Sequence, residues 1–327
     1  MTILVTGGAG YIGSHTVKLL RQGGHRAVVY DNLSTGNAAS VLGAPLETGD
    51  ILDGDRLDEV FRRHQPRCVI HFAASAYVGE SMVEPEKYYR NNISGTVSLL
   101  AALRRHGLPP IVFSSTCATY GLAAELPILE TTPQAPINPY GFTKLAIEHA
   151  LADYGRAYGL RSVAFRYFNA AGADPEGELG EDHDPETHAV PLCIQAALGQ
   201  RASFSVFGTD YDTPDGSCIR DYIHVMDLAS AHVAAAEYLM AGGASDVFNL
   251  ATGRGTSVIE IVKAVERVTG REVPAQYGPR RAGDPPALYA SAAKAERVLG
   301  WKPRYVNIDD TVAHAAAWFT RKGNQAA

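Results

Sequence analysis

The chain has 327 residues, 46% of them hydrophobic and 20% charged, and a formal net charge of −6, which is typical of a globular protein with one large or two joined domains. The acidic balance argues against a nucleic-acid partner or a membrane surface, and no apolar run is long enough to span a bilayer. The four cysteines are widely separated and form no C-x-x-C pair, so we expect reduced thiols and a cytoplasmic protein.

The first predicted element is a strand at 3–5, which leads directly into three glycines and a helical pattern over 11–22. In a phosphate-binding turn, Gly7 permits the sharp bend, Gly10 lets the backbone approach a pyrophosphate, and Gly13 lets the helix pack against the sheet. The amide groups at the start of the helix then point toward the anion. The segment therefore predicts a dinucleotide-binding turn.

A second strand, at 27–30, ends in Asp31, where a carboxylate can bind the adenosine ribose of a dinucleotide. The same negative charge would repel a 2′-phosphate, so NAD is favoured over NADP. Asp31 could instead form a turn or cap a helix. Asp50 follows an extended segment at 46–49 and is either close to the adenine or an ordinary loop residue.

Strand-like and helix-like segments alternate over the first half of the chain. This alternation predicts an α/β fold, a doubly wound parallel sheet of the Rossmann type with helices on both faces. We expect residues 1–168 to form an NAD-binding domain to which later segments return. The further strands are predicted at 68–73, 111–113 and 162–165, and the further helices at 55–64, 84–106 and 140–158.

The character of the sequence changes after residue 168. The region 170–190 is rich in Gly, Pro, Asp, Glu and His, which predicts a loop. We interpret 169–327 as mainly a smaller C-terminal α/β lobe that binds the substrate. In it we expect helices at 190–199, 226–241, 257–269, 291–299 and 308–321, and strands at 204–207 and 246–250.

One part of the predicted loop contains residue types that suit a metal ion. It lacks two histidines one helical turn apart, and a loop does not by itself hold ligands together, so we expect no metal site. The residues are Glu181, Asp182, His183, Asp184, Glu186 and His188.

Tyr140 and Lys144 lie four positions apart on a predicted helix and therefore share one face. A free tyrosine, with a pKa of about 10, is a poor base at neutral pH. A nearby lysine, together with a positively charged nicotinamide ring, would favour the phenolate and lower that pKa. Alone, the spacing is more often that of two surface residues, but after a dinucleotide-binding turn it predicts an acid–base pair.

Hydroxyl side chains follow the strand at 111–113, at the edge where parallel sheets bind ligands. Thr116 can donate to a substrate oxygen and pass a proton toward Tyr140. We expect Ser114 and Ser115 to cap the turn.

Five motifs occur in order along the chain: T-G-G-A-G-Y-I-G, F-S-S-T-C-A-T-Y-G, N-P-Y-G-x-x-K, R-Y-F-N-A-A-G and R-D-Y-I-H-V-x-D-L. Together they resemble the extended short-chain dehydrogenase/reductase family and, within it, the UDP-glucose 4-epimerases, including the bacterial ones that supply galactose for exopolysaccharide. The resemblance implies a tightly bound NAD, a UDP-sugar substrate and inversion at sugar C4 through a 4-keto sugar, with the hydride held on NAD. It also implies a homodimer formed by the helices near 84–106 and 140–158.

The resemblance assigns roles to single residues. Tyr140 would take the proton of the sugar 4-hydroxyl, Lys144 would bind the nicotinamide ribose and tune Tyr140, and Thr116 would hold the 4-oxygen. Besides the three glycines, Tyr140 and Lys144, the implied cofactor-binding residues are Tyr11, Ile12, Asp31, Asn32, Asp50, Ile51, Phe72, Ala73, Ala74, Asn91 and Phe168.

For the nucleotide sugar, the resemblance points mainly to the second lobe. Arginine suits a diphosphate because its guanidinium group presents a fork of donors, although a lone arginine is more often a surface charge. His188 stands where an asparagine commonly contacts the diphosphate. Leu288 stands where the size of the sugar C2 substituent is limited, which favours sugars without an N-acetyl group. The implied contacts are Asn169, His188, Ser205, Val206, Phe207, Arg220, Arg281, Asp284 and Leu288, with Thr116 at the sugar.

Other functions are left open. A UDP-xylose/UDP-arabinose 4-epimerase would share every catalytic residue. A 4,6-dehydratase is disfavoured because Cys117 and Ala118 stand where that chemistry uses a carboxylate pair. A non-catalytic NAD-binding scaffold on the same fold would have no need for Thr116, Tyr140 and Lys144 together.

Overall fold

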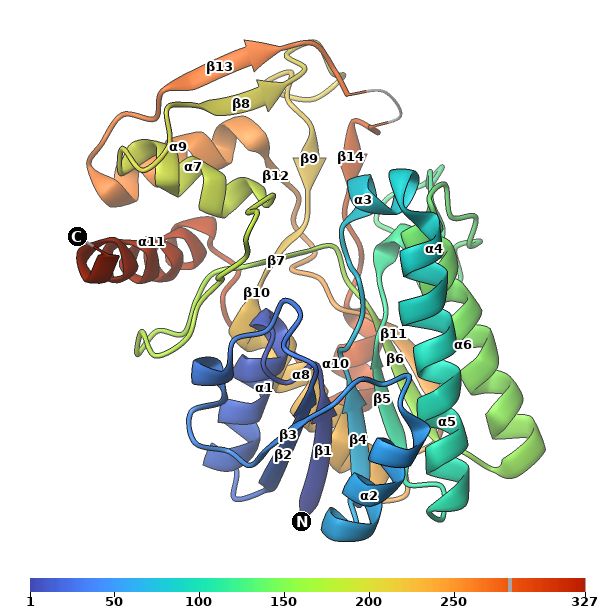
Figure 1. The fold of residues 1–327 in the computed structure, drawn as a ribbon. Helices are drawn as coiled ribbons and strands as arrows, with labels where there is room; N and C mark the ends of the chain where they lie inside the picture. Colours follow the sequence, from blue (N-terminus) through green and yellow to red (C-terminus); the bar gives the residue numbers. More distant parts are fainter. Residues whose placement is uncertain (282–283, 327) are drawn as a thin grey trace.

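A seven-stranded parallel sheet forms the centre of the computed structural model, which describes residues 1–281 and 284–326 (Figure 1). The strand order β11-β6-β5-β4-β1-β2-β3 reverses direction beside β1, as in a doubly wound sheet. No helix in the described ranges is both long and apolar enough to cross a membrane. The strands are β1 (Thr2–Thr6), β2 (Arg26–Asp31), β3 (Leu46–Thr48), β4 (Cys68–His71), β5 (Ile111–Ser114), β6 (Ser162–Arg166) and β11 (Asp246–Asn249).

Both faces of this sheet are covered, which explains why its strands are continuously apolar. In β1, Ile3 and Val5 belong to one buried cluster and Leu4 belongs to the other. Helices α1 (Tyr11–Gln22) and α8 (Val225–Met240) cover the first face. The second face is covered by α2 (Gly54–His64), α5 (Gly95–Arg105) and α6 (Pro139–Tyr158). The predicted α/β fold is confirmed.

The chain crosses between the sheet and a second lobe more than once. Strand β11 and helix α8 come from beyond residue 168, yet both belong to the sheet layer. The small helix α10 (Ala293–Leu299) also packs against them.

The second lobe, at the top of Figure 1, is built from three helices and a two-stranded parallel sheet. Val206, Ile261 and Val312 meet in its core. Ser257 and Glu260 cap the start of one of its helices reciprocally, which fixes where that helix begins. The elements are α7 (Ala189–Ala197), α9 (Val258–Thr269), α11 (Ile308–Ala326), β8 (Phe204–Phe207) and β13 (Ala275–Gly278).

Short strands link the sheet layer to the second lobe. The pair of β7 and β10 and the three-stranded set β12-β9-β14 have two or three residues per strand. None of them was predicted, because so few residues show no periodicity. They are β7 (Asn169–Ala171), β9 (Ile219–Arg220), β10 (Tyr222–His224), β12 (Thr256–Ser257) and β14 (Ala287–Leu288).

The single helix expected at 84–106 is wrong in detail. The chain forms α3 (Val78–Val83), α4 (Pro85–Tyr88), a π-helical segment at Tyr89–Ser94, and then α5. Buried Asn92 lies in the π-helical segment, where it accepts from the Ser75 amide (2.8 Å) and donates to the Ser75 carbonyl (3.0 Å). This wider turn therefore anchors the chain that follows β4, and such turns are frequent near functional sites.

Candidate active site

The turn between β1 and α1 has the geometry expected of a dinucleotide-binding turn. Gly7 has a φ of +72°, and a Cβ there would lie 2.5 Å from the Ala73 amide nitrogen. A Cβ at Gly13 would lie 2.2 Å from the Gly7 carbonyl oxygen. Gly10 offers no side chain to cap α1, so the amide groups of the first turn can bind an anion. These residues fit the pyrophosphate of NAD.

Replacing Gly13 with alanine should weaken NAD binding by at least about tenfold, because the added methyl group must push the turn apart. The measurement is a calorimetric titration of NAD into cofactor-stripped protein. Gly79→Ala is the control, since no atom lies within 4 Å of a Cβ at that position. Equal affinity in the two variants would contradict the assignment of the turn.

Asp31 lies at the carboxyl end of β2, against the glycine turn. Its carboxylate accepts from the amides of Ala9 (3.0 Å) and Leu33 (2.8 Å). The bond to Leu33 forms the local turn that was one of the two roles expected for Asp31. The carboxylate therefore stabilises its own loop beside the glycine turn. Asn32 donates to Asp50 at 3.0 Å, which places these two expected cofactor residues side by side.

The other expected cofactor residues follow neighbouring strands of the same sheet edge. The amides of Phe72 and Ala73 donate to the Thr6 carbonyl (2.9 and 3.1 Å), which holds the chain after β4 against the glycine turn. Asn91 donates to the Ser75 hydroxyl at 3.3 Å. Ile51 is buried, Ala74 lies between Ala73 and Ser75, and Phe168 follows β6 and packs beside Cys117.

Tyr11 and Ile12 occupy the first turn of α1. The Tyr11 hydroxyl donates to the Gly172 carbonyl at 2.6 Å, so it ties the start of this helix to the segment after β7. Ile12 is partly buried against the core between the sheet and α8.

The expected catalytic residues come from β5 and α6. Asn138 accepts from the Gly141 amide at 2.8 Å and Pro139 is the first residue of α6, so the start of this helix is fixed. A Cβ at Gly141 would lie 2.6 Å from the Ala118 carbonyl oxygen, which brings the helix close to the turn after Thr116. The sequence of this helix start therefore sets the position of Tyr140 relative to Thr116.

Lys144 lies one turn further along α6 and is buried. Its ammonium group donates to the Ser114 carbonyl at 2.8 Å and lies 5.9 Å from the centre of the Tyr140 ring. Burial lowers the pKa of Lys144 to about 7, and the Glu148 carboxylate opposes that shift.

The pKa of Tyr140 differs from the sequence expectation. Burial raises it to about 12, and the nearby Thr116 hydroxyl opposes this rise. The desolvation of the phenolate outweighs any attraction to a lysine whose own charge is disfavoured by burial. The expected lowering of the phenol pKa is therefore not a property of the chain by itself.

The shifted pKa of Lys144 predicts a pH dependence of stability. Since its pKa is about 7 in the folded chain and about 10.5 in the unfolded chain, the unfolded chain binds more protons between these values. Stability should therefore rise with pH in this window. From pH 7 to pH 9, cofactor-stripped protein should gain roughly 2 kcal/mol more than a Lys144→Met variant in denaturant titrations. If the free energy of unfolding of the two proteins changed equally between pH 7 and pH 9, the lowered pKa of Lys144 would be contradicted.

Ser114 and Ser115 do not cap the turn as expected. The hydroxyl of Ser114 shares a hydrogen bond with that of Tyr167, and Ser115 donates to Glu148. Arg166 binds the same Glu148 carboxylate through its Nε at 3.1 Å. No sequence pattern marks this network, although Glu148 lies one helical turn beyond Lys144.

The expected substrate residues lie in the second lobe and in the short strands that link it to the sheet. Asn169 donates to the Asp221 carbonyl at 3.2 Å. Arg220 pairs with Asp284, and the Arg281 guanidinium lies 4.2 Å from the centre of the Phe207 ring. These contacts bring arginines of two distant segments to one region of the lobe.

Residues of β8 and β14 are the remaining expected contacts of the nucleotide sugar. Ser205 is exposed, whereas Val206 is fully buried in the lobe core, so only its backbone can face a nucleotide. Leu288 packs against the buried cluster that contains Cys117 and Ala290, and Phe168 packs against the same cluster.

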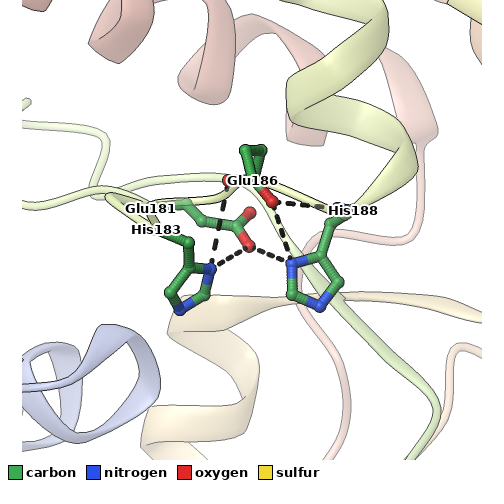
Figure 2. A group of neighbouring side chains, drawn as sticks. All are labelled: Glu181, His183, Glu186 and His188. Atoms are coloured by element: carbon green, nitrogen blue, oxygen red, sulfur yellow. Dashed lines mark hydrogen bonds and ion pairs between the residues drawn. The ribbon is translucent and has the colours of Figure 1, made fainter. Parts of the chain in front are cut away.

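Four side chains of the segment between β7 and α7 gather in one group (Figure 2). His188 at the start of α7 faces the carboxylates of Glu181 (2.6 Å) and Glu186 (3.2 Å). Burial acts to lower the pKa of His188. The two carboxylates outweigh this effect and raise the pKa of the imidazole to about 10. The fourth member, His183, lines a hollow with Gly10 and Tyr11.

Comparisons with known proteins agree with this geometry. The model of the NAD dependent epimerase/dehydratase family matches residues 3–251. The UDP-glucose 4-epimerase of Rhizobium meliloti (strain 1021) is 56% identical over 320 residues, which cover 98% of this chain and 97% of that protein.

Two solved structures are similar over nearly their whole length. The UDP-glucose 4-epimerase from Brucella ovis in complex with NAD has a TM-score of 0.96 at 57% identity and covers 97% of this chain and 98% of its own. The enzyme from Bifidobacterium longum in complex with NAD+ and UDP has a TM-score of 0.93 at 40% identity, with 99% of both chains covered. On the family model and on these similarities, the chain belongs to the NAD dependent epimerase/dehydratase family.

Proposed function

We propose that the chain is an NAD-dependent UDP-sugar 4-epimerase that interconverts UDP-glucose and UDP-galactose. The observation that carries this proposal is the meeting of Thr116, Tyr140 and Lys144 at the ligand-binding edge of the sheet that also carries the glycine turn. The relatives reported with bound NAD and UDP support the same cofactor and the same nucleotide for this chain.

In this proposal, NAD accepts and returns a hydride at sugar C4 when it is bound, and its positive ring favours the Tyr140 phenolate. Tyr140 takes the proton of the sugar 4-hydroxyl and later returns it. The Thr116 hydroxyl holds the same oxygen near the phenol, and the ammonium of Lys144, anchored on the Ser114 carbonyl, binds the nicotinamide ribose. Lys144 is buried and Tyr140 is half-buried, so water has little access to the ammonium group and only partial access to the phenol.

The UDP group would lie against the second lobe. Arg220 and Arg281 supply positive charge for the diphosphate, and Asn169 supplies an amide donor. Arg220 is paired with Asp284, so binding of the diphosphate competes with an existing ion pair and leaves the Asp284 carboxylate for a ribose hydroxyl. Leu288, which packs against the cluster that contains Cys117, favours a sugar without a bulky C2 group.

The test is to incubate purified protein separately with UDP-galactose, UDP-xylose and UDP-N-acetylgalactosamine, and to resolve the products by chromatography. We expect UDP-glucose from the first and much slower conversion of the third. Fastest conversion of UDP-xylose would favour the pentose epimerase, and no product from any of the three would favour a scaffold.

We also propose a homodimer through the face formed by α5, α6 and the π-helical segment. Tyr89, Val97 and Phe142 on this face are 42–47% exposed, and the Tyr89 and Phe142 rings are 6.1 Å apart between centroids. Apolar side chains grouped in this way favour association. Light scattering should give about twice the chain mass of 34.9 kDa, and Val97→Glu should reduce it toward a single chain. A single-chain mass for the unaltered protein would contradict the dimer.

A further inference from the structure

The segment between β7 and α7 brings together four side chains that nothing in the proposed reaction requires as a group. Glu181, His183, Glu186 and His188 each direct one nitrogen or oxygen atom to a common point, and these atoms lie within 4.8 Å of one another (Figure 2). We propose that they form a structural site, closed by four protein ligands, for a divalent cation of the zinc class.

The distances in the group suit such a cation. Glu181 Oε1 lies 3.0 Å from His183 Nδ1 and 2.6 Å from His188 Nδ1. Ligands at about 2.0–2.1 Å around a tetrahedral zinc lie roughly 3.3 Å apart, so the closest of these atoms would move apart and the most distant would approach by up to about 1.5 Å on binding. Two imidazole nitrogens and two carboxylate oxygens also balance the charge of a divalent ion.

A second observation is independent of this convergence. The Glu186 side chain is only 7% exposed, and its Oε1 accepts from the amides of Thr187 (2.7 Å) and His188 (2.9 Å). Within the described ranges, its Oε2 makes no hydrogen bond and is 3.9 Å from His183 Nδ1. Figure 2 marks this contact with a dashed line between Glu186 and His183. A cation at the centre of the group would bind this oxygen, which the present hydrogen bonds of the Glu186 carboxylate do not use.

A second acidic group nearby behaves differently. Asp174, Glu176 and Glu178 also approach one another, but the ammonium of Lys18 lies among them at 2.6, 2.5 and 2.7 Å. A lysine already supplies the positive charge there. The group at 181–188 has no lysine or arginine in this central position, only two imidazoles.

The position of the site suggests what the cation would do. The His183 ring lies 6.1 Å from the ring of Tyr11 in α1 and 6.0 Å from that of Tyr77. A cation would therefore lock this segment beside the dinucleotide-binding turn. It would use Nδ1 of His188 and leave Nε2 of that ring free for the substrate diphosphate.

The experiment uses chelator-treated full-length protein titrated with Zn²⁺ and, separately, with Co²⁺. We expect about one Zn²⁺ per chain, a higher thermal midpoint, and the intense visible bands that tetrahedral Co²⁺ gives. Glu186→Gln and His183→Ala should each weaken Zn²⁺ binding at least about 100-fold, since even outer-shell changes cost 10–100-fold. Glu178→Gln, in the acidic group around Lys18, is the matched control and should bind as the unaltered protein does.

Equal Zn²⁺ affinity in the unaltered protein and Glu186→Gln would overturn the proposal, as would a weak, octahedral Co²⁺ spectrum. If both ligand variants fail to fold, the Co²⁺ spectrum of the unaltered protein decides alone. Neither readout depends on turnover of a UDP-sugar, so failure of the metal site and failure of the epimerase assignment are distinguishable.

Discussion

Tyr140→Phe should lower the kcat for UDP-galactose by about 10²–10⁴-fold, because it removes the only group proposed to carry the 4-hydroxyl proton. Phenylalanine retains the ring, which packs edge-on against Tyr88, with 6.4 Å between the ring centroids. We therefore expect NAD binding and thermal stability to change little. The measurement is steady-state kinetics with a coupled assay for UDP-glucose.

Tyr158→Phe provides the matched control, since it makes the same change in α6 at a partly exposed position far along the helix. Its activity should equal that of the unaltered protein. If Tyr140→Phe retained more than about a tenth of the activity, another group would have to move the proton.

Arg166→Met should destabilise the protein by about 3–5 kcal/mol, because it leaves Glu148 as an unpaired buried charge. The side chains of the pair are 6% and 7% exposed, and Arg166 also donates to the Tyr120 hydroxyl at 2.9 Å. Denaturant unfolding measures the loss. The double variant Arg166→Met, Glu148→Leu should recover much of it, because both charges are then gone.

The exposed pair of Arg156 and Asp153 in α6 is the control for this effect. Arg156→Met should cost less than about 1 kcal/mol, since solvent screens a surface pair. If Arg166→Met were equally mild, the buried network could not be what holds the end of β5 beside α6.

The sheet and its glycine turn could be predicted from the sequence because their signals are local. Strand β1 is a continuous apolar run, and Gly13 is required by a contact with Gly7, a few residues earlier in the same turn. The start of α6 is equally local, since Asn138 and Pro139 mark it within two positions.

Long-range features could not be predicted in the same way. Strand β9 has two residues, and its partners β12 and β14 lie far along the chain, so no pattern marks it. The network of Ser115, Glu148 and Arg166 depends on how α6 packs against two strands. The grouping of Glu181 with His188 depends on the path of an irregular segment, which spacing rules for helices do not describe.

The pKa of Tyr140 shows a further limit. The spacing of Tyr140 and Lys144 correctly predicts that they share one helix face. The direction in which the pKa of Tyr140 shifts depends on burial, which the sequence does not show. Burial raises the pKa of the phenol to about 12 and lowers that of the lysine to about 7, so the two groups become less alike in proton affinity. A positive ring beside the phenol would oppose this rise in its pKa.

The fate of a deuterium label at sugar C4 tests the proposed reaction most directly. UDP-galactose deuterated at C4 would be converted by the purified protein in ordinary water, and the UDP-glucose formed would be analysed by mass spectrometry and NMR. Because hydride leaves and returns inside one closed site, the product should keep its deuterium at C4. Replacement of that deuterium by hydrogen from water would contradict hydride transfer to a bound nicotinamide and, with it, the roles given to Thr116, Tyr140 and Lys144.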